Sequence, residues 1–245
     1  MANLANNPFN GLRYLLQGFR LITQPGLRRF VIIPTLINIS VFIGLGYFAF
    51  NQIDIITESY IANLPDWLQW LDWIAEFAIV LFLGVIAFFS FTLIANLICA
   101  PFNGPLAEAV HQRLTGQTTS SPWHESITTL PATFADEFRK MFYAVSRSLP
   151  FLLLFLLPGI NVIASLLWMI FAAWLLALQY LDYPLGNRHI RFAQQRALLG
   201  QYRWLTWGFG GGVLLCTLIP VLNLLIIPAA VAGATALQVK EIETP

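Results

Sequence analysis

Charged residues are scarce in this sequence of 245 residues. Lys, Arg, Asp and Glu together make up 10% of the chain, whereas soluble globular domains are close to one-quarter charged. Hydrophobic residues make up 58% of the chain, and the mean hydropathy is +0.69. A chain of this length cannot bury so much apolar side chain in a water-soluble core. The sequence therefore predicts an all-α integral membrane protein.

The sequence also lacks the patterns of common catalytic, nucleotide-binding and metal sites. It has no Walker A phosphate loop, no Gly-x-Gly-x-x-Gly fingerprint and no Gly-x-Ser-x-Gly nucleophile elbow. No acidic or cysteine pattern with metal-ligand spacing accompanies its histidines. Cys99 and Cys216 both lie in apolar runs, as is typical of small buried hydrophobes rather than of a disulfide pair. We expect no enzyme activity, no metal, no cofactor and no nucleic-acid partner.

Four runs without charge dominate the chain, and they cover residues 30–50, 77–100, 148–181 and 204–239. A membrane-spanning helix needs about 20 apolar residues, so the first two runs each predict one transmembrane helix. The last two are too long for one span and tight for two. Pro158 interrupts the third run, and Pro220 and Pro228 interrupt the fourth. We expect two helical hairpins, re-entrant or tightly packed, with their tips at the elements Pro158–Asn161 and Pro220–Asn223; short spans joined by a tight turn are the alternative.

The basic residues indicate how the chain lies in the membrane. All 13 Lys and Arg residues lie before the first run, between the second and fourth runs, or after the fourth. Residues 51–76 contain none and carry several acids. The positive-inside rule then predicts that both termini are cytoplasmic and that only the stretch near residues 51–76 faces out. The sequence predicts a single membrane domain, residues 1–245, in contact with the lipid bilayer.

Two segments outside the apolar runs also have helical periodicity. Residues 1–29 include a stretch, Phe9 to Ile22, whose apolar residues recur at helical spacing. It predicts an amphipathic helix that lies at the membrane interface or, equally, packs on the protein itself. Residues 102–147 predict cytoplasmic helices, and the second run could continue through Pro101 into them. The glycines of 208–212 predict a flexible or close-packed element.

The polar stretch Gln24 to Arg29 directly precedes the first run. Pro25 and Gly26 should break the incoming helix, so that the next helix begins with free backbone N–H groups and the positive end of its dipole. Arg28 and Arg29 lie at this point, and amides with guanidinium groups form a site for a tetrahedral oxyanion. The alternative is ordinary anchoring, in which both arginines contact lipid headgroups.

Polar residues at membrane depth or at helix breaks are candidates for a translocation path. The alternative for each is that it shapes a turn or a helix end. Glu108 and Arg113, near the cytoplasmic end of the second run, could form a gate. The candidates are Asn38, Asn96, Asn103, Glu108, Arg113, Asn161 and Asn223.

Short motifs spread in order along almost the whole chain resemble the CysZ family of sulfate permeases. They include Pro25–Phe30 with Pro34, Leu36 and Asn38, Pro65–Leu71, Ala100–Glu108, Arg113–Gly116, Pro158–Ile160, Gln179–Pro184, Ile219–Leu224 and Ala232–Ala236.

The resemblance implies an ATP-independent permease of the bacterial inner membrane that takes up sulfate for cysteine synthesis. It implies two long transmembrane helices, two hemi-penetrating hairpins, and assembly into dimers or larger homo-oligomers. It also implies that sulfate binds Gly26, Leu27 and Arg28, with Arg29 adjacent. We expect channel-like flux, because no acid in the apolar runs offers a proton carrier. The rival functions are transport of another oxyanion, such as sulfite or thiosulfate, and a non-transporting membrane scaffold.

Overall fold

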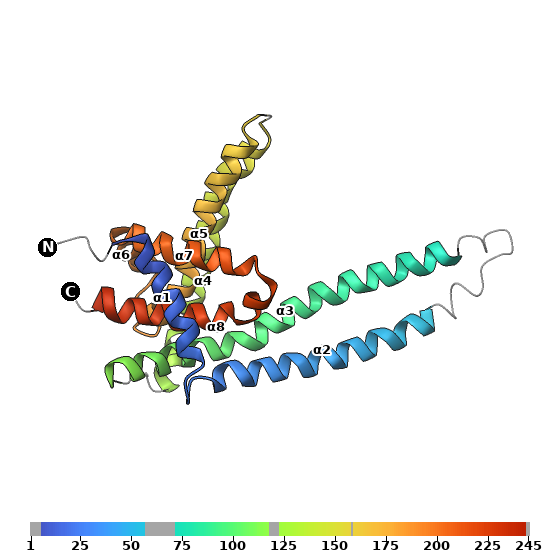
Figure 1. Cartoon of the computed structure of the whole chain (residues 1–245), viewed down its shortest axis with the longest axis horizontal. Coiled ribbons are helices and arrows are strands. Elements are labelled where there is room, and N and C mark those ends of the chain that lie inside the picture. Colours follow the sequence, from blue (N-terminus) through green and yellow to red (C-terminus); the bar gives the residue numbers. More distant parts are fainter. Residues whose placement is uncertain (1–5, 57–71, 118–122, 158, 244–245) are drawn as a thin grey trace. The chain divides into compact units, whose positions relative to one another are not determined.

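The computed structural model describes residues 6–56, 72–117, 123–157 and 159–243, and this part of the chain is helical with short connections (Figure 1). Two units can be described separately: residues 32–102 form one, and residues 1–31 with 103–245 form the other, which we call the helical body. The helices are α1 (Pro8–Ile22), α2 (Arg29–Ile56), α3 (Asp72–Thr115), α4 (Trp123–Phe155), α5 (Asn161–Gly186), α6 (Phe192–Gln201), α7 (Arg203–Thr217), α8 (Pro220–Leu237) and the π-helical segment η3 (Gln238–Glu243).

The first two apolar runs form the long helices α2 and α3, which run in opposite directions (Figure 1). The expected continuation of the second run is present, because α3 passes through Pro101 without ending. It stops at Thr115, where Gly116 takes a φ of +75° that a side chain would oppose. Residues 100 and 102 are therefore not helix boundaries, and the segment predicted to be cytoplasmic begins inside a continuous helix.

Three helical stretches in the described part of the chain are long and apolar enough to cross a membrane. They are Arg29–Phe48, Asn161–Gly186 and Leu225–Glu243. Only 6% of the first window and 22% of the second are buried inside the protein, against 61% of the third. Apolar side chains that the protein does not cover need lipid around them. The chain is an integral membrane protein, as its composition predicts.

The third and fourth apolar runs each fold into two helices; Pro158 itself lies outside the described residues. In the third run, α4 ends at Phe155 and α5 begins at Asn161 (Figure 1). Gly159 between them has a φ of +88°, which favours glycine. In the fourth run, α7 ends at Thr217 and α8 begins at Pro220, a residue that suits a first helical turn. Pro228, in contrast, lies inside α8 without ending it.

Helix α1 packs against α7 and α8 in the helical body, so the second of its two predicted placements is present. It buries Gly11, Leu15 and Gly18. A Cβ added at Gly11 would meet backbone atoms of α7, and one added at Gly18 would come within 2.7 Å of the Gly233 amide nitrogen of α8. Such close approach of helix backbones is the usual use of small residues in membrane proteins. Leu16, on the predicted apolar face, is 57% exposed.

Candidate functional site

The connection between α1 and α2 forms a tight turn around Gly26. Helix α1 ends at Ile22, and Gly26 has a φ of +89°, which few other residues adopt. The next side chain, Leu27, is buried in the core of the helical body with 3% exposure. Gly26 itself is exposed, and a Cβ added there would meet no atom within 4 Å. Glycine is therefore needed for backbone conformation, and Leu27 anchors the turn.

Most backbone amides of this turn already have partners. The N–H groups of Leu27 and Arg28 both donate to the Gln24 carbonyl, at 3.1 and 3.2 Å. Those of Phe30 and Val31 donate to carbonyls in the turn, each at 3.1 Å. The expectation of free amides at the start of α2 therefore holds only in part, because those of Phe30 and Val31 bond within the turn. Among the described residues, the amides of Gly26 and Arg29 have no carbonyl acceptor and could meet an anion.

The side chains around this turn are strongly cationic. Arg28 and Arg29 are both exposed, and the Arg29 guanidinium lies over the Phe30 ring at 4.9 Å from its centroid. Among the described residues, no carboxylate forms an ion pair with either of them. The Arg113 Nη1, at the end of α3, donates to the Pro25 carbonyl at 3.1 Å. The structure thus brings one predicted gate residue to the predicted sulfate motif, which sequence separation alone did not indicate.

Two other candidates lie on α3 in the helical body, and one of them has a hydrogen-bond partner on another helix. Asn103, 6% exposed, donates from Nδ2 to the Tyr183 hydroxyl at 3.1 Å. Glu108, on the same helix α3, is half-buried. Asn103 thereby joins α3 to α5, as expected of a packing residue, and a role in the path stays a prediction.

The other asparagines lie elsewhere. Asn38 belongs to the unit of residues 32–102, where it donates to Cys99 Sγ at 3.4 Å while its Oδ1 is buried with no partner among the described residues. Asn161 lies at the hairpin turn; with its amide nitrogen turned to the carbonyls of Phe155 and Leu157, it donates to them at 3.2 and 3.1 Å. The side chains of Asn96 and Asn223 lie outside the described residues.

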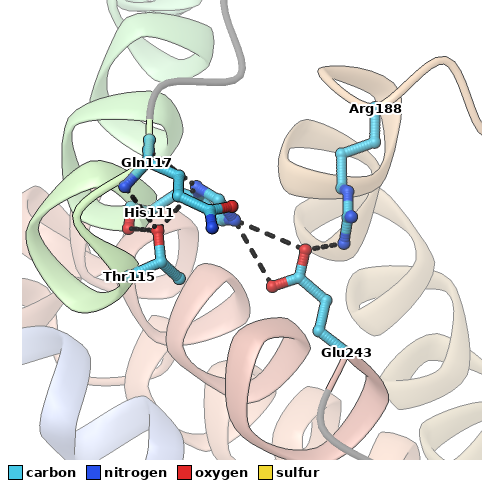
Figure 2. A network of polar contacts seen from close by, with 5 residues as sticks. All are labelled: His111, Thr115, Gln117, Arg188 and Glu243. Carbon is cyan, nitrogen blue, oxygen red and sulfur yellow. Dashed lines mark hydrogen bonds and ion pairs between the residues drawn. The ribbon is translucent and has the colours of Figure 1, made fainter.

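A polar network at the C-terminal end of α3 was missed in the sequence. Figure 2 shows Glu243 between His111 and Arg188, with Thr115 and Gln117 beside the histidine. Glu243 Oε1 lies 3.3 Å from His111 Nε2 and is paired with Arg188. Nearer the start of η3, Glu241 accepts from the Tyr14 hydroxyl at 2.5 Å. These contacts fix η3 to α1, α3 and the segment after α5. Because the residues that make them are far apart in the sequence, they form no motif that sequence analysis could find.

Comparison with known proteins identifies relatives along almost the whole chain. The family model described as sulfate transporter CysZ/etoposide-induced protein 2.4 matches residues 14–228. A protein of Pseudomonas fluorescens (strain Pf0-1), named sulfate transporter CysZ, is 42% identical over 95% of this chain and 94% of its own length. The protein of the same name from Pseudomonas aeruginosa (strain LESB58) is 43% identical over 95% of both chains. That from Pectobacterium atrosepticum is 40% identical over 97% of this chain and 87% of its own length.

Proposed function

The chain belongs to the sulfate transporter CysZ/etoposide-induced protein 2.4 family, and on that basis we propose that it carries sulfate across a membrane. The bacterial relatives that it resembles over nearly their full length are named as sulfate transporters. The observation in the structure that supports this function is the cationic turn between α1 and α2. It has two exposed arginines without carboxylate partners in the described residues, and a third arginine is bonded to its backbone.

Charge and geometry support sulfate binding at this turn. Arg28 and Arg29 offer N–H donors in a planar fork, which suits the oxygens of a tetrahedral dianion. The two amides without carbonyl acceptors, those of Gly26 and Arg29, can add directed donors. The positive end of the α2 dipole lies at the same place, because α2 begins at Arg29. Leu27 contributes by fixing the turn to the core, not by contacting the ion.

Binding here should be weak and exchangeable, as transport requires. The arginines are exposed to solvent and not enclosed, so water competes for the ion and salt screens its attraction. Arg113 holds the turn through the Pro25 carbonyl with one Nη atom, and its positive charge adds to the local field. We assign Gly26, Arg28 and Arg29 to sulfate contact and Arg113 to positioning of the turn.

The membrane arrangement is part of the same proposal. The distribution of basic residues supports cytoplasmic termini in the bacterial inner membrane, which puts the sulfate turn on the cytoplasmic side. There it would collect or release sulfate, or report its internal level. Helices α2 and α3 span the bilayer, and the hairpins α4–α5 and α7–α8 enter it from the cytoplasm. The protein acts as a homo-oligomer.

The driving force is a chemical gradient in this proposal. Inward movement of a divalent anion opposes a negative cytoplasmic potential by about 2.3 kcal/mol per charge for each 100 mV. Rapid use of sulfate in cysteine synthesis can maintain the opposing gradient. The sequence has no Walker A loop that could couple the flux to ATP, and we propose channel-like movement through the protein.

Uptake of radiolabelled sulfate into proteoliposomes tests the proposal. We expect wild-type flux above that of empty liposomes and a strong loss in Arg28→Gln/Arg29→Gln. Arg139→Gln/Arg191→Gln is the matched control, because it removes the same charge from exposed arginines outside the turn. Flux that survives in the first variant would leave a permease whose turn serves only as a lipid anchor.

The two rival functions give different results in the same vesicles. A transporter of another oxyanion would show flux of labelled thiosulfate or sulfite that excess sulfate does not inhibit. A membrane scaffold would show no flux of any of these ions, although the protein is correctly folded and inserted. Sulfate-dependent protection against thermal unfolding, absent in Arg28→Gln/Arg29→Gln, separates a sulfate site from both rivals.

A further inference from the structure

Two arginines from different helices lie beside one tyrosine ring at the base of the α4–α5 hairpin. The Arg147 guanidinium carbon is 6.0 Å from the centroid of the Tyr143 ring, and that of Arg196 is 5.1 Å from it. Arg147 and Tyr143 lie one turn apart on α4, and Arg196 belongs to α6. A single aromatic side chain thus gathers two positive charges that are far apart in sequence.

The tyrosine is held in place from its other sides. Trp174 Nε1, on α5, donates to the Tyr143 hydroxyl at 3.1 Å. The Phe192 ring meets the tyrosine edge to face, with the centroids 5.7 Å apart. Fixed contacts on α5 and α6 reduce the freedom of the ring, so the two guanidinium groups start from a restricted arrangement. Such pre-organisation lowers the entropic cost of binding a ligand between them.

The other cationic side chains near this position on α4 already have partners. Arg139 pairs with Asp136 at 3.0 Å, and Lys140 pairs with Asp182 at 2.5 Å. Arg147 and Arg196 are both exposed, and within the described residues neither forms an ion pair with a carboxylate. Their charges are therefore available to an anion from outside the chain.

An exposed apolar face lies next to this cationic pair on α4. Phe142, Val145 and Leu149 recur at helical spacing and are 66%, 57% and 52% exposed. Arg147 is the last charged residue before the third apolar run, so it lies where headgroups meet hydrocarbon. Tyr143 and Trp174 are the aromatic types that favour this depth. The two cations suit an anionic headgroup, and the exposed apolar face beside them suits a hydrocarbon chain.

We propose that this surface binds an anionic phospholipid such as phosphatidylglycerol. Its phosphate accepts hydrogen bonds from the guanidinium groups of Arg147 and Arg196, and an acyl chain lies along Phe142, Val145 and Leu149. A phosphodiester suits the planar fork of arginine, and basic groups between membrane helices on the cytoplasmic side are typical headgroup sites. A free inorganic anion would not use the apolar face. The site is independent of the sulfate turn and of sulfate transport.

Native mass spectrometry of the purified full chain in detergent, titrated with phosphatidylglycerol or phosphatidylcholine, tests this site. We expect the wild type to retain phosphatidylglycerol and not phosphatidylcholine. Arg147→Gln/Arg196→Gln should lower the affinity for phosphatidylglycerol about 25-fold, because each basic residue near an anionic lipid surface contributes roughly fivefold. Arg139→Gln/Arg191→Gln removes the same net charge elsewhere and should change the affinity by less than about threefold.

Several results would overturn the lipid site. Equal losses in the two double variants would indicate general surface charge. Displacement of the lipid by millimolar inorganic phosphate would indicate a free-anion site. Absence of bound lipid, together with conversion of dimers to monomers by Arg147→Gln/Arg196→Gln, would indicate that a second copy of the chain covers this face. If the double variant fails to fold, Arg147→Gln alone should lose about fivefold, and unchanged affinity in it refutes the site.

Discussion

Adjacent glycines of α7 should respond in opposite ways to the same substitution. A Cβ added at Gly210 would collide with the backbone carbonyl oxygen of Ala173 on α5, lie 2.8 Å from the Ala173 carbonyl carbon, and lie 3.0 Å from the Ala177 Cβ. A Cβ added at Gly211 would meet no atom within 4 Å. Gly210→Ala therefore tests whether α5 and α7 are packed backbone to backbone, and Gly211→Ala is its matched control.

The magnitude follows from two opposing terms. Alanine is favoured over glycine in a helix by about 1 kcal/mol, which applies to both positions. Overpacking a close contact costs about 1–3 kcal/mol, and the backbone atoms that Gly210→Ala would meet cannot rotate away, so we take the upper value. The net expectation is a loss of about 2 kcal/mol for Gly210→Ala and a gain of up to about 1 kcal/mol for Gly211→Ala. At about 2–4 °C per kcal/mol for a chain of this size, the two variants should differ in Tm by about 6 °C or more.

Thermal unfolding of the two purified variants in the same detergent, followed by tryptophan fluorescence, measures this difference. Wild type should lie between them or beside Gly211→Ala. Equal Tm values, or a more stable Gly210→Ala, would show that α5 and α7 do not approach as closely as the structure has them.

Three further changes test other parts of the helical body. Burial alone would lower the pKa of Lys140, but its carboxylate partners outweigh burial and raise that pKa above the usual 10.5. The charged lysine therefore stabilises the folded state fully below pH 10.5 and less as the pH rises above it. The Tm advantage of wild type over Lys140→Met should persist to pH 10.5 and shrink above it. A constant advantage up to pH 12 would contradict the ion pair as its cause. Glu243→Gln should lower the free energy of unfolding by about 1–3 kcal/mol, because it leaves His111 and Arg188 without a carboxylate. Glu137→Gln, at an exposed glutamate, should lower it by less than about 1 kcal/mol in the same melts. Arg113→Gln should weaken sulfate-dependent protection less than Arg28→Gln/Arg29→Gln does, and complete loss of protection would place the guanidinium in direct contact with sulfate.

Much of the local structure could be predicted from the chain itself. The scarcity of charge required lipid around the protein, because apolar side chains of uncharged runs cannot all be buried in so short a chain. Prolines and glycines marked the helix breaks around Gly26, at Gly116 and between α4 and α5, since these residues restrict or free the backbone independently of tertiary contacts. Motifs along the chain also indicated the family that the comparisons show.

Some local predictions failed or stayed open because they depended on packing. The sequence left open whether the second run continues through Pro101, and the structure shows that α3 does so. The amides at the start of α2 were expected to be free, but those of Phe30 and Val31 bond to carbonyls of the turn. The N-terminal helix had an apolar face, yet the residues that pack most closely are Gly11 and Gly18, because helix backbones approach most closely at residues without side chains.

The sequence by itself determined that this is a helical membrane protein of the sulfate transporter family, with its helix breaks and its cationic turn in place. Only the tertiary structure decided which residues far apart in the sequence come into contact. Arg113 reaches the Pro25 carbonyl from the far end of α3, and Arg147 and Arg196 meet beside Tyr143 from two helices. Local backbone preferences act between neighbours in the chain and can be read from the order of residues. Contacts between helices depend on how closely their backbones pack, and no single stretch of sequence contains that information.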